Sequence, residues 1–86
     1  MKFTVVAVPS VESALAKFFL EGPDPQAVTA AANWLDRELS NNPLSKVTPV
    51  DDLFFLRRNP LVVLCSISIE DRLVTIIEVN RTEEPR

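Results

Sequence analysis

Three arginines are the residues of this chain whose charge and spacing are best suited to chemistry. Arg57 and Arg58 are adjacent and precede Asn59-Pro60, and Arg81 closes a valine-rich segment. An arginine holds a phosphate or a carboxylate through paired hydrogen bonds, but it is effectively never deprotonated and makes a poor base. The three arginines are therefore candidate binding residues. The competing interpretation is that Arg57 and Arg58 only form the solvated end of a hairpin.

Residue counts exclude several mechanisms. The 86 residues include one cysteine, Cys65, and neither histidine nor tyrosine. An intrachain disulfide, a Cys/His zinc site and a histidine-activated nucleophile are therefore impossible. The single glycine leaves no glycine-rich phosphate loop. We accordingly expect no catalytic residue, no metal site and no cofactor.

The overall charge bears on the partner. The net charge is −3 and the pI is near 4.8, which disfavours direct binding to the phosphates of a nucleic acid. The N-terminal apolar run is too short for a signal peptide, and no segment approaches the roughly 20 apolar residues of a membrane helix. We therefore expect a cytoplasmic protein that does not associate with a membrane.

Start and stop signals divide the chain into six elements. The β-branched run at 2–8 predicts a strand that Pro9 closes, and Ser10 is the expected N-cap of a helix that Gly22-Pro23 stops. Asp24 and Pro25 begin a second helix, which ends at 41–43. From residue 53 the apolar period changes to two, which predicts three further strands, at 53–56, 61–69 and 73–79.

This order, strand–helix–helix–strand–strand–strand, predicts an α+β fold with a helical hairpin packed on one face of a mainly antiparallel sheet. Residues 1–81 form one domain, and 82–86 form a polar C-terminal tail. The segment 61–64 is apolar on both faces and so needs cover on each. The hairpin covers one face only. The sequence therefore predicts an exposed apolar strip around Phe55, Val62 and Leu64 beside the arginine pair, of the kind that marks a binding surface.

The second half of the chain, RRNPLVVLCSISIEDRLVTIIEVNR, resembles the RelE/ParE superfamily of toxin–antitoxin and plasmid stabilisation toxins. The matching features are a strand that ends at Arg57-Arg58, an Asn59-Pro60 turn, an acidic turn at Glu70-Asp71 and a final strand that closes on Arg81. The helical hairpin has the family's length and placement. The resemblance implies a RelE/ParE-like fold and an antitoxin protein as partner.

The sequence departs from the members of this family that cleave messenger RNA. Positions where those members carry basic residues correspond to Leu53, Phe55 and Val62, and Leu61 replaces an aromatic residue. Glu78 is a conceivable base without support from the family pattern. The resemblance thus implies a toxin-like protein that acts by protein binding, with gyrase as one possible target.

Two further functions stay open. One is an active ribosome-dependent mRNA endonuclease that uses Arg57, Arg58 and Arg81, and the other is a degenerate homologue without toxicity. A homodimer formed through the apolar strip is a structural alternative.

Overall fold

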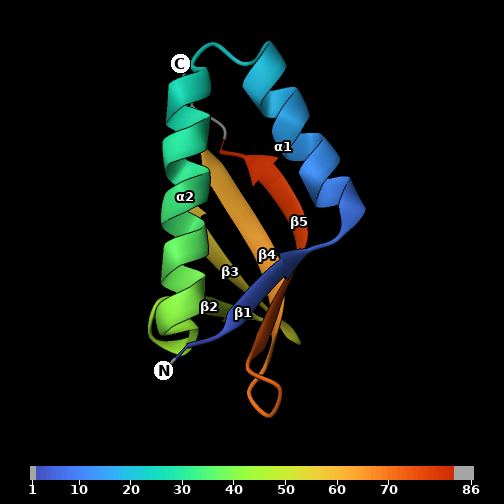
Figure 1. Cartoon of the computed structure of the whole chain (residues 1–86), viewed down its shortest axis with the longest axis vertical. Coiled ribbons are helices and arrows are strands. Elements are labelled where there is room, and N and C mark those ends of the chain that lie inside the picture. The colour runs from blue at the N-terminus through green and yellow to red at the C-terminus, as the bar shows by residue number, and fades with distance from the viewer. Residues whose placement is uncertain (1, 83–86) are drawn as a thin grey trace.

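The computed structural model describes residues 2–82 and contains two long helices and five strands (Figure 1). In chain order the elements are β1 (Thr4–Ala7), α1 (Pro9–Glu21), α2 (Pro25–Asn41), the 3-10 turn η1 (Pro43–Ser45), β2 (Thr48–Val50), β3 (Leu53–Arg58), β4 (Leu61–Ser68) and β5 (Leu73–Arg81). The polar tail was predicted at 82–86; Thr82 is described, and residues 83–86 lie outside the described residues.

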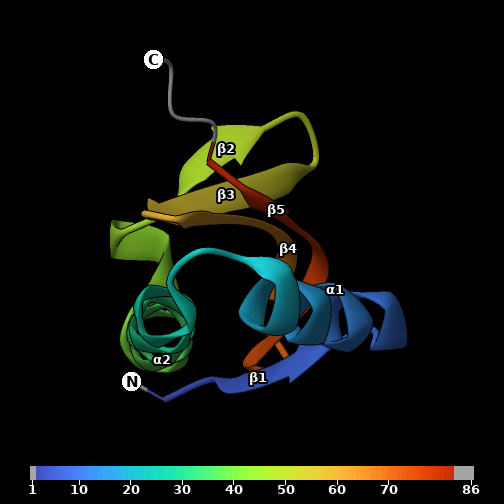
Figure 2. The same ribbon diagram turned by 90° about the horizontal axis from the view of Figure 1, so that it is seen from above.

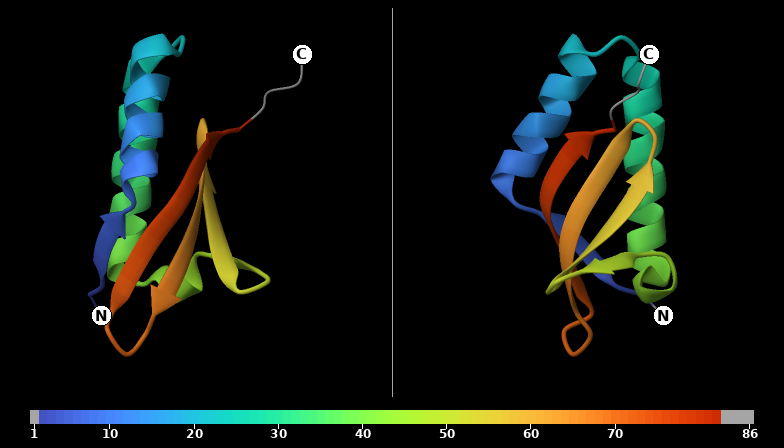
Figure 3. Two further views of the ribbon diagram at one scale, coloured as in Figure 1. Left: turned by 90° about the vertical axis from the view of Figure 1, so that its right-hand side faces the viewer. Right: turned by 180° about the vertical axis from the view of Figure 1, so that it is seen from behind.

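The five strands form one sheet in the order β1-β5-β4-β3-β2. β1 is parallel to β5, and the other three pairings are antiparallel. Both helices lie on the same side of this sheet, as Figure 2 and the left view of Figure 3 show. The predicted α+β fold, with a helical hairpin on one face of a mainly antiparallel sheet, is therefore confirmed.

The core lies between the helices and one face of the central strands. Alternate residues of β4, namely Leu61, Val63 and Cys65, are buried there. α2 contributes an apolar stripe in which Val28, Ala31, Leu35 and Leu39 are all buried. A helical period of 3.6 residues aligns these four positions on one face, so α2 forms the main cover of the sheet.

The two helices begin differently. Asp24 caps α2 as predicted, because its side chain accepts a hydrogen bond from the Ala27 amide at 3.1 Å, and Pro25 occupies the first turn. The predicted cap at Ser10 is wrong: α1 begins at Pro9 and its N-cap is Val8, without a side-chain hydrogen bond. Proline is well suited to a first helical position, because its missing amide hydrogen has no helical acceptor there.

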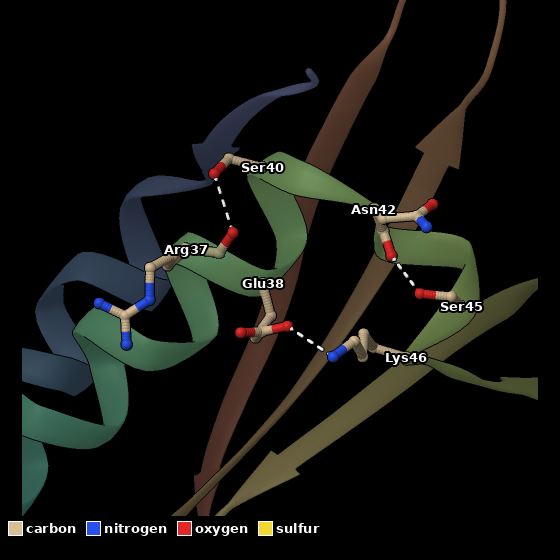
Figure 4. Close-up of polar contacts among 6 residues, drawn as sticks. All are labelled: Arg37, Glu38, Ser40, Asn42, Ser45 and Lys46. Atoms are coloured by element: carbon tan, nitrogen blue, oxygen red, sulfur yellow. Dashed lines mark hydrogen bonds and ion pairs between the residues drawn. The ribbon is translucent and has the colours of Figure 1, made fainter. Parts of the chain in front are cut away.

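Polar contacts stabilise the passage from α2 to β2 (Figure 4). The Ser40 hydroxyl donates to the Arg37 carbonyl at 3.0 Å, and the Ser45 hydroxyl donates to the Asn42 carbonyl at 2.9 Å. Lys46 Nζ lies 3.0 Å from Glu38 Oε1. These contacts close the end of α2 and turn the chain towards the sheet.

β2 is a fifth strand that the sequence pattern does not predict. All three of its residues are exposed, so they show no alternation, and the central one is Pro49. Proline lacks an amide hydrogen and is confined to edge strands, and β2 is indeed the edge of the sheet. A short, fully exposed edge strand has no apolar periodicity by which it can be recognised.

The last two strands are paired along almost their whole lengths. β5 runs two residues further than predicted, to Arg81. The register between β4 and β5 shifts by one residue at Leu64/Cys65, because Leu64 pairs with Glu78 whereas Cys65 pairs with Ile76.

In the described part of the chain, neither helix is long and apolar enough to cross a membrane.

Candidate functional site

The sheet face opposite the helices carries a row of apolar side chains. Phe55 of β3 is directly opposite Leu64 of β4, and Arg57 is opposite Val62. Side chains of cross-strand partners point to the same face, and successive residues of a strand alternate between faces. Since Leu56 is buried beneath the helices, these four residues lie on the other side. We call Phe55, Arg57, Val62 and Leu64 the open face.

Among residues 2–82, no helix covers the open face (Figure 3). Phe55, Val62 and Leu64 are nevertheless only half-buried, because they shield one another, while Arg57 is exposed. Phe54 points the opposite way and packs against the core, so the two adjacent phenylalanines of β3 lie on opposite faces of the sheet.

Polar groups border the open face. Asn80 lies opposite Val62, and Glu78 lies opposite Leu64. The Asn80 amide donates to Glu78 Oε2 at 2.9 Å, and Arg57 Nε donates to Asn59 Oδ1 at 3.4 Å. Glu78 was a candidate from the sequence but Asn80 was not, since only strand register places the asparagine opposite Val62.

A shallow hollow of about 290 Å³ lies at the Arg57 end of the open face. Its lining residues are Phe55, Arg57, Val62, Arg81 and Thr82. Two buried polar atoms nearby, Nη1 of Arg81 and Oγ1 of Thr82, have no hydrogen-bond partner within the described chain.

The three candidate arginines do not all converge on one site: Arg57 and Arg81 both line the hollow, and Arg58 does not. Arg58 and Arg81 are the cross-strand partners of Leu61, which is fully buried on the helix side. The Arg58 guanidinium lies 4.8 Å from the centre of the Trp34 ring of α2, and that of Arg81 lies 5.8 Å from the Phe18 ring of α1. Each therefore makes a cation–π contact between the sheet and one helix.

Gly22 makes room for Arg81 at the end of α1. A Cβ atom at this position would lie 2.6 Å from the Phe18 carbonyl oxygen and 2.8 Å from Arg81 Nη1. The backbone angle of Gly22, φ −82°, suits any residue, so space alone makes the glycine necessary. In the sequence, Gly22 is recognisable only as a helix stop signal.

Cys65 is the only thiol, and it is a poor nucleophile. Its side chain is 0% exposed, and this burial raises the pKa of the thiol from 9.0 to about 11. The reactive form of cysteine is the thiolate, which is scarce at neutral pH in this environment. Within residues 2–82, no three carboxylate or thiol side chains gather into a potential metal site.

No family model matches the sequence, and no curated protein is significantly similar to it. Solved structures are similar in fold. A chain of the toxin–antitoxin complex RelBE2 from Mycobacterium tuberculosis aligns with a TM-score of 0.81 and 23% identity, over 98% of this chain and 95% of that one.

Two more distant structures agree. A chain of the RelE–RelB complex from Pyrococcus horikoshii aligns with a TM-score of 0.68 and 17% identity, over 99% of this chain and 100% of that one. A chain of the chromosomal ParDE system from P. aeruginosa aligns with a TM-score of 0.69 and 11% identity, over 95% and 98%. These likenesses confirm the RelE/ParE-like fold that the sequence predicted.

The contact between Gly22 and Arg81 predicts an energetic coupling. Gly22→Ala forces the guanidinium and the end of α1 apart, and we expect it to lower the free energy of unfolding by about 1–3 kcal/mol. Arg81→Ala removes one of the two clashing groups and should recover part of that loss. Urea denaturation of both single variants and the double variant measures the coupling. Additive effects would contradict the contact, and Glu21→Ala, at the exposed neighbouring position, is the control.

The raised pKa of Cys65 predicts a pH-dependent stability. Between pH 9 and 11 the unfolded chain releases the thiol proton while the folded chain retains it, so stability falls as the pH rises. The expected loss is about 2–3 kcal/mol over this interval. Urea denaturation at several pH values should show a steeper fall for the wild type than for Cys65→Ala, whose own stability is lower but lacks this titration. Equal slopes would refute the assignment.

Proposed function

We propose that this chain is the toxin-like component of a toxin–antitoxin system and that it acts by binding protein rather than by cutting RNA. The observation that carries the proposal is the open face, a row of apolar side chains that no described element covers. An apolar strip with a charged border is typical of a protein-binding surface. The structural similarity to chains from three toxin–antitoxin complexes supports an antitoxin as the partner.

The distribution of the arginines supports binding over ribonuclease activity. RNA cleavage needs a base for the 2′-hydroxyl and cations that converge on the same phosphate. Arg57 and Arg81 line the same hollow, but the Arg81 guanidinium lies against the Phe18 ring and Arg58 lies against the Trp34 ring, so the three cations do not converge on one point. Glu78 lies on the open face but already accepts a hydrogen bond from Asn80. This arrangement favours a protein target, such as gyrase, over a message on the ribosome.

Induction of the chain in a bacterial host separates the candidate functions. We expect a fall in viable cells with intact messenger RNA, because a protein-binding toxin arrests growth without cleaving messages. Viable counts and primer extension of abundant messages, taken in parallel, measure both outcomes. Ribosome-dependent cleavage that Arg57→Ala abolishes would instead support the endonuclease. Normal growth with abundant folded protein would support a non-toxic homologue.

The open face predicts the effect of one substitution on antitoxin binding. Leu64→Asp places a charge in the centre of the apolar row, and we expect it to weaken partner binding by roughly 30-fold or more while the fold is retained. The measurement is calorimetric titration with a candidate antitoxin, taken from the short reading frames that neighbour the gene, with circular dichroism to verify folding.

The matched control is Leu44→Asp, which introduces the same charge at an exposed leucine of η1. Binding by this control should equal that of the wild type. A folded Leu64→Asp variant with unchanged affinity would remove the open face from the interface. Light scattering of the free chain tests whether the same face forms a homodimer.

A further inference from the structure

A cleft of about 430 Å³ opens on the helix side of the molecule, between α1, α2 and β1. In Figure 1 the two helices diverge from their connecting loop, and β4 is visible between them. The floor of the cleft includes the buried residues Leu61 and Val63, and Leu15 and Ala32 line its walls. Its volume lies within the range of sites that hold drug-sized ligands or buried side-chain anchors.

Two carboxylates border this apolar cleft. Glu12 comes from the first turn of α1 and Asp36 from the middle of α2, and both are exposed. Within the described residues, the one ion pair joins Lys46 to Glu38, so neither carboxylate has a basic partner within 4.0 Å. Like charges beside an apolar, low-dielectric wall reinforce each other's field and attract a cation.

The charge of the whole chain is concentrated on this side. The helical hairpin, residues 9–41, contains five acidic and two basic residues, and its net charge of −3 equals that of the entire protein. The rest of the chain contains seven of each kind. The helix side is thus acidic, whereas the remainder of the chain is balanced.

We propose that the cleft binds a basic amphipathic segment of a partner protein. An apolar side chain of the segment occupies the space between α1 and α2, and a lysine or arginine lies beside Glu12 and Asp36. Val6 on the rim is 43% exposed, so the apolar surface continues from the cleft onto β1, where a ligand longer than the cleft covers it. A second copy of this chain would bring the same negative hairpin, which disfavours pairing of two hairpins.

This proposal is independent of the function assigned to the open face. The cleft and the open face lie on opposite sides of the sheet, since Leu61 and Val63 alternate with Val62 and Leu64 along β4. Substitutions at the cleft therefore test this inference alone, and Leu64→Asp provides a variant with an altered open face and an intact cleft.

The test uses three fluorescein-labelled peptides of about 14 residues with helical amphipathic spacing. One contains leucine and lysine, a second replaces lysine with glutamate, and a third replaces leucine with serine. Fluorescence anisotropy at physiological ionic strength should detect saturable binding of the leucine–lysine peptide only. Amide chemical-shift changes in NMR spectra of the labelled protein should centre on Val6, Leu15 and Ala32.

Charge variants test the role of the two carboxylates. Glu12→Lys with Asp36→Lys should weaken binding of the leucine–lysine peptide about tenfold or more. Glu21→Lys with Glu70→Lys changes the net charge equally at exposed positions outside the cleft, and its affinity should stay within roughly twofold of wild type. Glu12→Gln with Asp36→Asn provides a milder pair if the lysine variant does not fold, and it should also weaken binding.

Several results would overturn the proposal. Equal losses of peptide affinity in the two charge-reversed variants would mean that the net charge of the protein, and not the cleft, attracts the peptide. Equal binding of the serine–lysine peptide would exclude the apolar anchor. Binding of octylammonium without binding of the peptide would assign the cleft to a small amine, and loss of a wild-type dimer in the cleft variant would assign it to a second copy.

Discussion

Among the described residues, two helices cover one face of the five-stranded sheet and no helix covers the other face. This imbalance determines most of what the molecule presents to solvent. A chain of 86 residues supports one core with little additional structure. In β4 the apolar residues nevertheless fall on both faces: Leu61 and Val63 are buried under the helices, while Val62 and Leu64 remain half-buried on the uncovered side. The open face thus follows from the ratio of helices to strands among the described residues.

The arginines show how one residue type serves different purposes on the two faces. Arg58 and Arg81, at the ends of β3 and β5, flank Leu61 and lie against aromatic rings of α2 and α1. These contacts hold the helices against the sheet without covering its other face. Arg57, a single position away from Arg58, points in the opposite direction because strand residues alternate. It is exposed beside the apolar row, where it shares a hollow with Arg81.

The two sides of the molecule also differ in charge. The helix side carries the excess negative charge of the chain around an apolar cleft, and the open face has an arginine at one end and Glu78 with Asn80 along its border. Surfaces of such different character select different partners, because complementary charge sets the rate and specificity of association. The two sides of this small domain therefore present different charge patterns.

The sequence by itself determined the helices, the three long strands and the apolar row, because these depend on local signals and periodicity: Asp24-Pro25 begins α2, and alternation along 61–69 identifies β4. It also determined what chemistry is absent, since no histidine or tyrosine exists. Only the tertiary structure revealed β2, the division of the arginines and the contact between Gly22 and Arg81. The physical reason is that strand pairing and helix packing bring together residues that are far apart in the chain. Periodicity identifies a strand or a helix, but it does not identify which residues of other elements will contact it.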